Sequence, residues 1–234
     1  PVCSAGRRGA AAAGAPAAAL AARTIGVHRA PRFGPEERRQ RIASIFDGLN
    51  LEYEFMEDDD LFSHIATSIS NESVVGFFDG RAEFGPRALG SRSILADPRN
   101  SKAQQLLNEK IKKRESFRPF APSVLEEYGD DYFENYQFTP FMERVLPIKE
   151  SKRNDIPAVT HVDGSGRLQS VSKELRPRYH ALITKFYEKT GVPILINTSF
   201  NENEPVVNHP KEAIDCFLRT DLDILVLQNY ILKK

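Results

Sequence analysis

The chain has 234 residues, 41% of them hydrophobic and without an apolar run near the roughly 20 residues of a membrane span, so we expect a soluble protein with one substantial core. Basic and acidic residues are equal in number, 32 each, and a formal net charge of zero excludes neither an anionic nor a cationic ligand. The two cysteines, Cys3 and Cys216, form no CxxC pair; they indicate no disulfide framework and favour a reducing, cytoplasmic location.

Residues 1–33 are rich in alanine, glycine and arginine and match no secondary-structure pattern. Residues 1–35 contain five arginines and no acidic residue, a composition typical of an organelle transit peptide. A disordered or non-native leader accounts for the same composition, and we favour it. We therefore expect the folded domain to span residues 34–234.

Apolar residues at helical spacing predict five helices, each starting near a Pro, a Ser or an acidic run. They are expected over Pro35 to Leu49, Asp59 to Ser70, Ser101 to Lys113, Pro177 to Thr190 and Pro210 to Arg219. Ser101 is the expected cap of the third helix, and Gly191 that of the fourth. The acidic run Asp58-Asp59-Asp60 suits the helix dipole better than a metal site.

Short apolar runs between these helices predict buried strands. They are expected at Val74 to Phe78, Ile94 to Leu95, Pro193 to Ile196 and Asp223 to Leu227, with Phe117 to Leu125 extended. Residues 157–162 and 168–171 are expected to pair as a hairpin around the Asp163–Gly166 turn. Strands and helices mix along the chain with short connections, which predicts one α/β domain around a twisted mixed sheet flanked by helices.

The segment Gly80–Arg99, GRAEFGPRALGSRSILADPR, is the strongest indication of a ligand site. Its arginines offer rigid forks of donors that phosphate or carboxylate oxygens accept in pairs. Between Gly80 and Phe120, ten basic residues face four acidic ones. We expect the interleaved apolar residues to hold the segment against the core, unlike a solvated surface loop. These apolar residues are Phe84, Ala88, Leu89, Ile94 and Leu95.

Two later segments contain groups that bind anions. The glycines of Asp163–Arg167 allow backbone N–H groups to approach an anion, while His161 with Asp163 fits a metal site or, more simply, a polar pair at a strand end. In Leu195–Pro205, side-chain amides and hydroxyls follow a strand. They would either bind the phosphate or sugar of a nucleotide or only form the turn that ends the strand. The chain lacks GxxxxGK[ST], GxGxxG, GxSxG and zinc-ligand spacings, which excludes the commonest nucleotide folds.

Four segments, taken in their order along the chain, resemble the C-terminal region of the O-carbamoyltransferase family. This family includes nodulation and antibiotic carbamoyltransferases. The segments are EFGPRALGSRSILADPR, FRPFAPSVL, PAVTHVDGSGRLQSV and GVPILINTSFNENEPVV. The resemblance runs from about Gly34 to Lys234 and implies a YrdC-like domain that binds ATP and carbamoyl phosphate and makes carbamoyl-adenylate. Mg²⁺ is expected with ATP, held mostly by phosphate oxygens and water. The resemblance also implies a separate ASKHA-type partner domain, in cis or in trans, that passes the carbamoyl group to an acceptor hydroxyl.

The resemblance also implies the site residues. Its phosphate and carbamoyl ligands match Arg87, Lys112, Arg118, Arg167, Asn197 and Ser199, and Met142 matches a position lining the nucleotide or carbamoyl pocket. Arginines would neutralise phosphates, Lys112 would hold a mobile phosphate as a point charge, and Asn197 and Ser199 would orient carbamoyl or α-phosphate oxygens. The expected catalytic residues are Arg87, Lys112, Arg167 and Ser199.

The arginines of the opening segment are not equivalent in this interpretation. Arg87 is the expected ligand, and Arg81, Arg92 and Arg99 are expected to support the loop. The alternative function is a catalytically incomplete YrdC-like module that binds a nucleotide or RNA. We do not favour nucleic acid, because no basic face extends along a helix.

Overall fold

The computed structural model describes residues 35–234, except for the side chains of residues 35, 37 and 38. The expected leader, residues 1–33, lies outside the described residues. Eight strands form one mixed sheet in the order β1-β10-β9-β2-β3-β8-β4-β7. They are β1 (Glu54–Phe55), β2 (Val75–Phe78), β3 (Arg92–Ala96), β4 (Ala121–Leu125), β7 (Gln169–Val171), β8 (Ile194–Ser199), β9 (Ile224–Leu227) and β10 (Tyr230–Lys233).

The sheet is mixed because two of its strand pairs are parallel, β2 with β9 and β4 with β7, while the other neighbours are antiparallel. A second, two-stranded sheet joins β5 (Leu146–Pro147) to β6 (Ser165–Gly166). This arrangement confirms the predicted α/β class with a mixed sheet.

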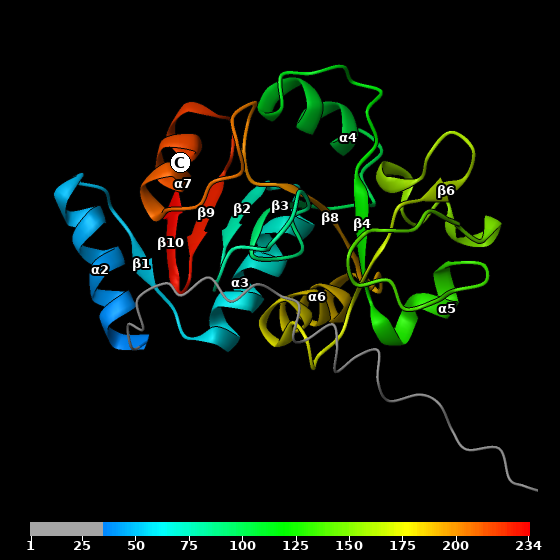
Figure 1. Ribbon diagram of the computed structural model, residues 1–234, viewed down its shortest axis with the longest axis horizontal. Helices are drawn as coiled ribbons and strands as arrows, with labels where there is room; N and C mark the ends of the chain where they lie inside the picture. The colour runs from blue at the N-terminus through cyan, green and yellow to red at the C-terminus, as the bar shows by residue number, and fades with distance from the viewer. Residues whose placement is uncertain (1–34) are drawn as a thin grey trace, which may run out of the picture. The chain divides into compact units, whose positions relative to one another are not determined.

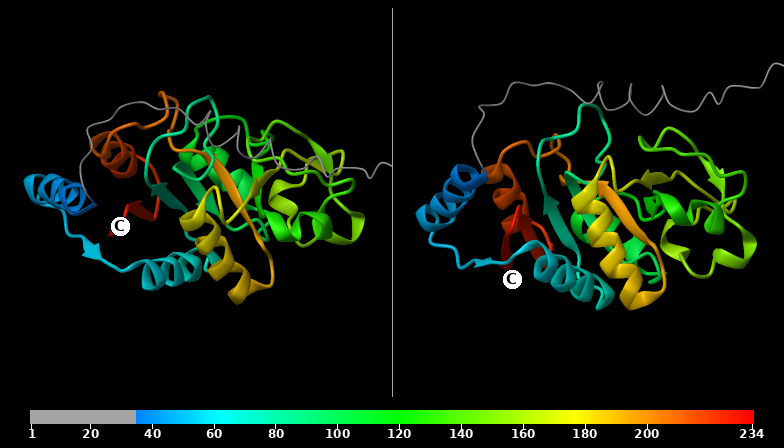
Figure 2. Two further views of the ribbon diagram at one scale, coloured as in Figure 1. Left: turned by 60° about the horizontal axis from the view of Figure 1, so that its bottom comes forward. Right: turned by 90° about the horizontal axis from the view of Figure 1, so that it is seen from below.

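Helices cover the sheet, and most of the predicted ones are present. They are α2 (Pro35–Gly48), α3 (Asp58–Ser70), α4 (Ala103–Leu106), α5 (Gly129–Tyr132), α6 (Pro177–Thr190) and α7 (Pro210–Arg219). The π-helical turn η1 (Leu107–Ile111) continues α4, and short 3₁₀ turns are η2 (Glu126–Tyr128), η3 (Glu150–Lys152) and η4 (Pro157–Val159). Helices α3 and α6 lie side by side along the sheet (Figures 1 and 2), and α7 packs on β2 and β9.

Local sequence explains where the longer helices begin and end. Pro177 opens α6, where a missing N–H costs nothing, and Gly191 ends it at φ 72°, a left-handed conformation that glycine adopts without strain. Helix α7 begins with a capping box: the Glu212 carboxylate accepts the backbone N–H groups of Asn208 and His209.

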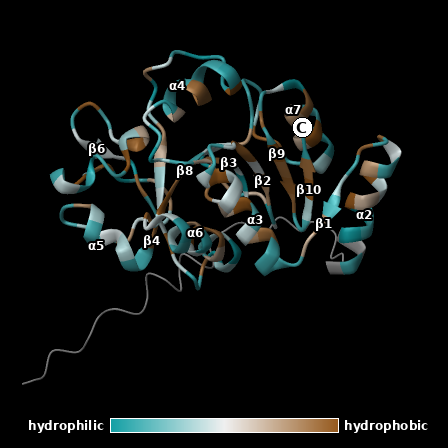
Figure 3. Ribbon diagram, turned by 180° about the vertical axis from the view of Figure 1, so that it is seen from behind, coloured by the Kyte–Doolittle hydropathy of each residue, from teal (hydrophilic) through white to brown (hydrophobic). Residues whose placement is uncertain are grey.

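The core lies on both faces of the central strands. Every residue of β2, β3, β4 and β9 is buried, and successive side chains of a strand point to opposite faces, so both faces must be covered. Figure 3 shows strands β9 and β10 as strongly hydrophobic. Phe77 and Phe78 belong to this core, but the expectation that Phe84 does so is wrong, because Phe84 is 74% exposed.

Two local predictions are also wrong. Residues 157–162 form no strand: η4 occupies part of this range, β6 pairs with β5, and β7 pairs in parallel with β4. An apolar pattern does not identify the long-range partner of a strand, and here the turn residues do not join neighbouring strands. Ser101 does not cap α4; Lys102 is at the N-cap, and the Asn100 side chain accepts the Lys102 N–H instead.

Within residues 35–234, no helix has the length and hydrophobicity required to cross a membrane.

Candidate anion-binding site

A cavity of about 480 Å³ lies where four segments of the chain meet, a volume within the usual range for small-molecule sites, about 300–1,000 Å³. The segments are the loop between β2 and β3, the stretch from η1 into β4, the region around residues 142–167, and the end of β8. The lining residues are Pro86, Arg87, Ala88, Arg114, Arg118, Pro119, Phe120, Ala121, Met142, Val145, His161, Arg167, Asn197, Thr198 and Ser199.

The loop between β2 and β3 is held by its own charged residues. A Glu83 carboxylate oxygen accepts the backbone N–H groups of Leu89 and Ser91, both at 2.7 Å. Buried Arg92 donates to the carbonyls of Asp79 and Gly80, which ties the start of the loop to β3. Arg92 therefore supports the loop, as predicted. Arg87, on the same loop, lines the cavity.

Gly90 is required where this loop rejoins the sheet. Its φ is 99°, which side-chain-bearing residues rarely adopt. A Cβ atom there would lie 2.3 Å from the ring of Tyr179 on α6. The motif thus needs glycine for both its backbone conformation and the close approach of the helix.

Asn197 lines the cavity and has an unpaired, buried acceptor among the described residues. Its Nδ2 donates to Gln169 Oε1 at 2.9 Å, Ser123 Oγ at 3.1 Å and the Ala88 carbonyl at 3.2 Å. Since a flipped amide would set oxygen against the Ala88 and Gln169 oxygens, the orientation is determined. Asn197 Oδ1 is buried and accepts no hydrogen bond within residues 35–234. A buried acceptor without a donor costs about 1–3 kcal/mol. Asn197 lines the cavity, but this oxygen has no accessible surface, so a ligand N–H group would reach it only with an adjustment of the lining.

Among the described residues, four guanidinium groups line the cavity and no acidic side chain does. Burial and the positive charge of Arg87 lower the pKa of Arg167. Burial and the charge of Arg118 lower the pKa of Arg114, although Glu115 opposes this shift. In the described part of the chain, Arg87 and Arg167 have no hydrogen-bond or ion-pair partner. Such clustered like charges favour a multiply charged anion.

Arg118 and Arg114 are held differently from that pair. Arg118 makes only a long contact with Glu115, 3.9 Å between their charged atoms, and both side chains are exposed. Arg114 donates to Asn108 Oδ1 at 2.6 Å and stacks over the Phe120 ring. Arg114 is therefore a fixed positive charge, whereas Arg118 is free to adjust to a ligand.

Met142 lies in the left-handed region, at φ 56°, and is only 5% exposed. It packs with Leu89 and Ala121 in a small apolar cluster beside the main core. A non-glycine residue in this conformation stores strain, which is common at binding sites. Here it joins the cavity wall to the arginine-bearing loop.

His161 lines the cavity; burial, aided by the charge of Arg167 and opposed by Asp163, lowers its pKa below the usual value. Its Nδ1 lies 3.1 Å from Ser165 Oγ, and that hydroxyl donates to Asp163 Oδ1 at 2.6 Å. The expected polar pair is thus bridged by Ser165. Asp163 also accepts the Ser165 N–H, so this amide is not available to an anion.

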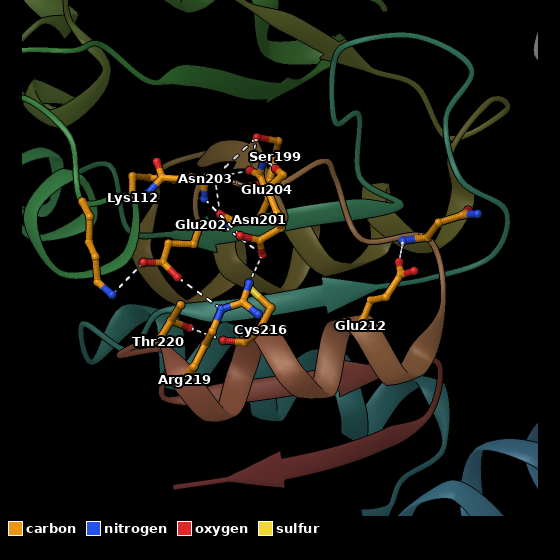
Figure 4. Close-up of polar contacts among 12 residues, drawn as sticks. Lys112, Ser199, Asn201, Glu202, Asn203, Glu204, Glu212, Cys216, Arg219 and Thr220 are labelled. Atoms are coloured by element: carbon orange, nitrogen blue, oxygen red, sulfur yellow. Dashed lines mark hydrogen bonds and ion pairs between the residues drawn. The ribbon is translucent and has the colours of Figure 1, made fainter.

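Lys112 does not line the cavity. It is 2% exposed and its Nζ donates to the carbonyls of Ser199 and Asn201 and to Asn201 Oδ1 (Figure 4). Burial lowers the pKa of Lys112 to about 7. Its expected contact with a phosphate stays a prediction, and in this arrangement it would require these hydrogen bonds to be exchanged.

Six of the seven predicted site residues therefore line one cavity: Arg87, Arg118, Met142, Arg167, Asn197 and Ser199. Their roles as ligands stay predictions. Sequence reasoning did not assign Arg114 and His161 to the site. Arg114 follows two lysines in the basic stretch that precedes β4, and His161 was considered only with Asp163.

The chain is an α/β domain with an arginine-lined cavity, and its fold is YrdC-like. A crystal structure of Sua5 from P. abyssi, complexed with L-threonine, superposes with a TM-score of 0.52 over 75% of this chain and 48% of that one. The sequence identity is 15%, so this similarity shows the fold alone.

Sequence comparison identifies the family. The family described as carbamoyltransferase C-terminus matches residues 66–234, so the chain belongs to this family. The nodulation protein NolNO of Sinorhizobium fredii is 53% identical over 180 residues, 75% of this chain and 26% of that protein. The nodulation protein NolO of Bradyrhizobium diazoefficiens is 44% identical over 212 residues, 89% of this chain and 38% of that protein. The chain thus spans well under half the length of these relatives.

Proposed function

We propose that this chain binds ATP and carbamoyl phosphate in the cavity and forms carbamoyl-adenylate. A transfer domain outside these residues, in cis or in trans, then passes the carbamoyl group to an acceptor hydroxyl. The observation that carries the proposal is the combination of four arginines, no acidic lining residue and one unpaired buried acceptor, Asn197 Oδ1.

The substrates fit this combination. Phosphate oxygens accept paired hydrogen bonds from guanidinium groups, so Arg87, Arg118 and Arg167 would neutralise them. The carbamoyl group carries an NH₂, which can donate to Asn197 Oδ1. An acyl phosphate without an N–H donor would leave that buried oxygen unpaired, which favours carbamoyl over acetyl phosphate.

The reaction needs positioning and charge stabilisation more than a strong base. Carbamoyl phosphate reacts with water to give carbamate and inorganic phosphate. A carbamate oxygen then attacks the α-phosphorus of ATP, and the bond from that phosphorus to pyrophosphate breaks. Negative charge accumulates on phosphoryl oxygens, where preorganised guanidinium groups stabilise it. Mg²⁺ would be held by phosphate oxygens and water, because no carboxylate lines the cavity.

The direct test is pyrophosphate release. The purified chain is incubated with Mg-ATP, with and without carbamoyl phosphate, and pyrophosphate is measured by a coupled assay. We expect release that depends on carbamoyl phosphate and is much weaker with acetyl phosphate. No release from protein whose circular dichroism shows an intact fold would reject the proposal. Tight ATP or RNA binding without release would instead favour the non-catalytic module.

A further inference from the structure

His161 differs in its acid–base chemistry from the other side chains that line the cavity. Among the described residues, the rest of the lining consists of four arginines, three polar side chains that carry amides or hydroxyls, and apolar side chains. Arginine stays protonated, and amides and hydroxyls do not take up protons near neutral pH. In this part of the chain, His161 is therefore the one lining side chain that can accept a proton near neutral pH.

A tight turn holds His161 next to Ser165. The His161 N–H donates to the Ser165 carbonyl, and the Gly164 N–H donates to the His161 carbonyl, both at 2.8 Å. Gly164 has φ 78°, a conformation that glycine adopts without strain. Ser165 begins β6, which pairs with β5, and the Ile148 N–H donates to the Gly164 carbonyl at 2.9 Å. The turn is thus fixed on the two-stranded sheet.

Hydrogen bonds determine which nitrogen of the neutral His161 ring carries the proton. Hydrogen bonds from Ser165 lower the pKa of Asp163, so Asp163 is a carboxylate at neutral pH. The Ser165 hydroxyl donates its proton to Asp163 Oδ1 at 2.6 Å, so Ser165 Oγ can only accept from His161 Nδ1, which lies at 3.1 Å. In the neutral ring, Nδ1 is therefore the donor and Nε2 carries the lone pair.

The lone pair of Nε2 is available to a ligand. Nε2 has no hydrogen-bond partner among the described residues, and unlike Nε2 of His64 it is not fully buried. Burial lowers the pKa of His161 below 6.5; Arg167 adds to this shift and Asp163 opposes it. The other charged side chains of the lining within residues 35–234 are all positive: Arg87, Arg114 and Arg118. These surroundings favour the neutral ring near neutral pH.

We propose that His161 is the general base for the attack of water on carbamoyl phosphate, and that Ser165 and Asp163 are its positioning residues. The inference rests on the proposed function, because it assigns a residue to the first step of that reaction. Only this step requires a nucleophile to lose a proton, since carbamate attacks ATP as an anion. Arg167, whose charge acts on His161, would hold the phosphate that leaves.

The proposed step balances in atoms, protons and electron pairs. His161 Nε2 takes a proton from water as the water oxygen bonds to the carbonyl carbon of carbamoyl phosphate. The bond from that carbon to the bridging phosphate oxygen breaks, and the phosphate leaves with the electron pair. Nε2 then gives its proton to the phosphate, and the carbamic acid releases its own proton to solvent as it becomes carbamate.

A comparison of two carbamate sources tests this assignment on the full chain. Pyrophosphate release is measured with Mg-ATP and either carbamoyl phosphate or ammonium carbamate, because ammonium carbamate supplies carbamate without the attack of water. Phosphate release from carbamoyl phosphate is measured in parallel. The variants are His161→Gln, Ser165→Ala and Asp163→Asn. His64→Gln is the matched control, because burial also lowers the pKa of His64 and it lies outside the cavity lining.

His161→Gln should lower kcat with carbamoyl phosphate by about 10²-fold, the lower end for general-base catalysis, and leave its KM within about threefold. With ammonium carbamate it should stay within about threefold of the wild type, since no base is needed. Ser165→Ala should cost about tenfold with carbamoyl phosphate, because it no longer orients the ring. His64→Gln should stay within about twofold with either source.

The pH profile gives a second readout. Wild-type kcat/KM for carbamoyl phosphate should fall as the pH decreases below 6.5, because His161 then becomes protonated. Asp163→Asn retains an acceptor for Ser165 but removes the charge that raises the pKa of His161. The fall in activity should therefore move to lower pH in this variant. The His64→Gln profile should match the wild type.

An equal loss of His161→Gln with both carbamate sources, or no loss with either, would overturn the inference. If His161→Gln fails to fold, the profile of Asp163→Asn decides, and an unshifted profile overturns the inference. A wild type that releases phosphate but no pyrophosphate defeats the proposed function alone, and loss of phosphate release in His161→Gln then supports His161 as the base. A wild type that releases neither overturns both.

Discussion

At the scale of single residues, the cavity depends on a few side chains whose partners are missing inside the described fold. Arg87 and Arg167 share the cavity wall, and the charge of Arg87 depresses the pKa of Arg167. Asn197 Oδ1 is buried without a donor. These side chains have unfavourable interactions when no ligand is bound. Substitution of one of them should therefore weaken ligand binding and leave the fold stable.

Arg167→Ala should therefore lower kcat/KM for pyrophosphate release by about 10²–10³-fold, the range measured for single charge-stabilising groups. Its unfolding midpoint should stay the same or rise, because a partly buried cation near Arg87 is removed. Arg81→Ala is the control. It also removes one positive charge, but Arg81 is exposed and lies outside the cavity lining. Equal losses in both variants would point to a general charge effect.

Gly90→Ala should destabilise the fold by about 2–4 kcal/mol, since it combines an unfavourable φ with overpacking. The new Cβ would lie 2.3 Å from the ring of Tyr179, a buried side chain of α6. Gly191→Ala is the control, since its φ is 72° but no atom lies within 4 Å of the added carbon. It should cost about 1 kcal/mol in urea unfolding. Equal costs would show that the contact with Tyr179 does not matter.

At the scale of elements, α4, η1 and the loop after β8 form one unit that carries Lys112. The buried lysine has a pKa of about 7, lowered from 10.5 mainly by burial. The unfolded chain therefore holds this proton more tightly than the folded chain does. Between these two pKa values, stability must rise with pH as the folded protein loses the buried charge.

Urea unfolding of the wild type and Lys112→Met from pH 7 to pH 10 tests this prediction. The wild type should gain stability relative to the variant by up to about 1.4 kcal/mol per pH unit, the limit for one proton. Lys113→Met, which changes an exposed lysine, should follow the wild-type curve. Parallel curves for the wild type and Lys112→Met would show that Lys112 titrates normally in the folded protein.

At the scale of the whole molecule, the last two strands complete the sheet. Strand β9 lies between β10 and β2, and β10 pairs with β1, so the end of the chain joins segments from its first half. Removal of β9 and β10 would expose an edge of β2 whose residues are all buried.

A chain that ends at Thr220 should therefore lose cooperative unfolding and aggregate, as measured by circular dichroism melting and size-exclusion chromatography. Removal of Lys234 alone is the control, and it should shift Tm by at most about 3 °C. A shortened chain that still melts cooperatively would show that the β9–β10 pair is not needed for the core.

Much of the fold was predictable because its signals are local. The helices at Pro35, Pro177 and Pro210 begin with residues that suit a first turn, and the buried strand at Val75–Phe78 is an uninterrupted apolar run. The strand at Tyr230–Lys233 was missed, although its first three residues are buried. The hairpin error and the exposed Phe84 have one cause: pairing and burial depend on distant segments.

By itself, the sequence determined the α/β class, the arginine-rich loop and the residues that match the family's ligands, because these follow from residue type, spacing and order. Only the tertiary structure decided that Arg114 and His161 join the cavity, that Asn197 Oδ1 has no donor within residues 35–234, and that Lys112 is buried in hydrogen bonds to Ser199 and Asn201. The physical reason is that a side chain's hydrogen-bond partners come from segments distant in sequence. Lys112 and Asn201 are 89 residues apart, yet Lys112 Nζ donates to Asn201 Oδ1, which also accepts the Ser199 hydroxyl.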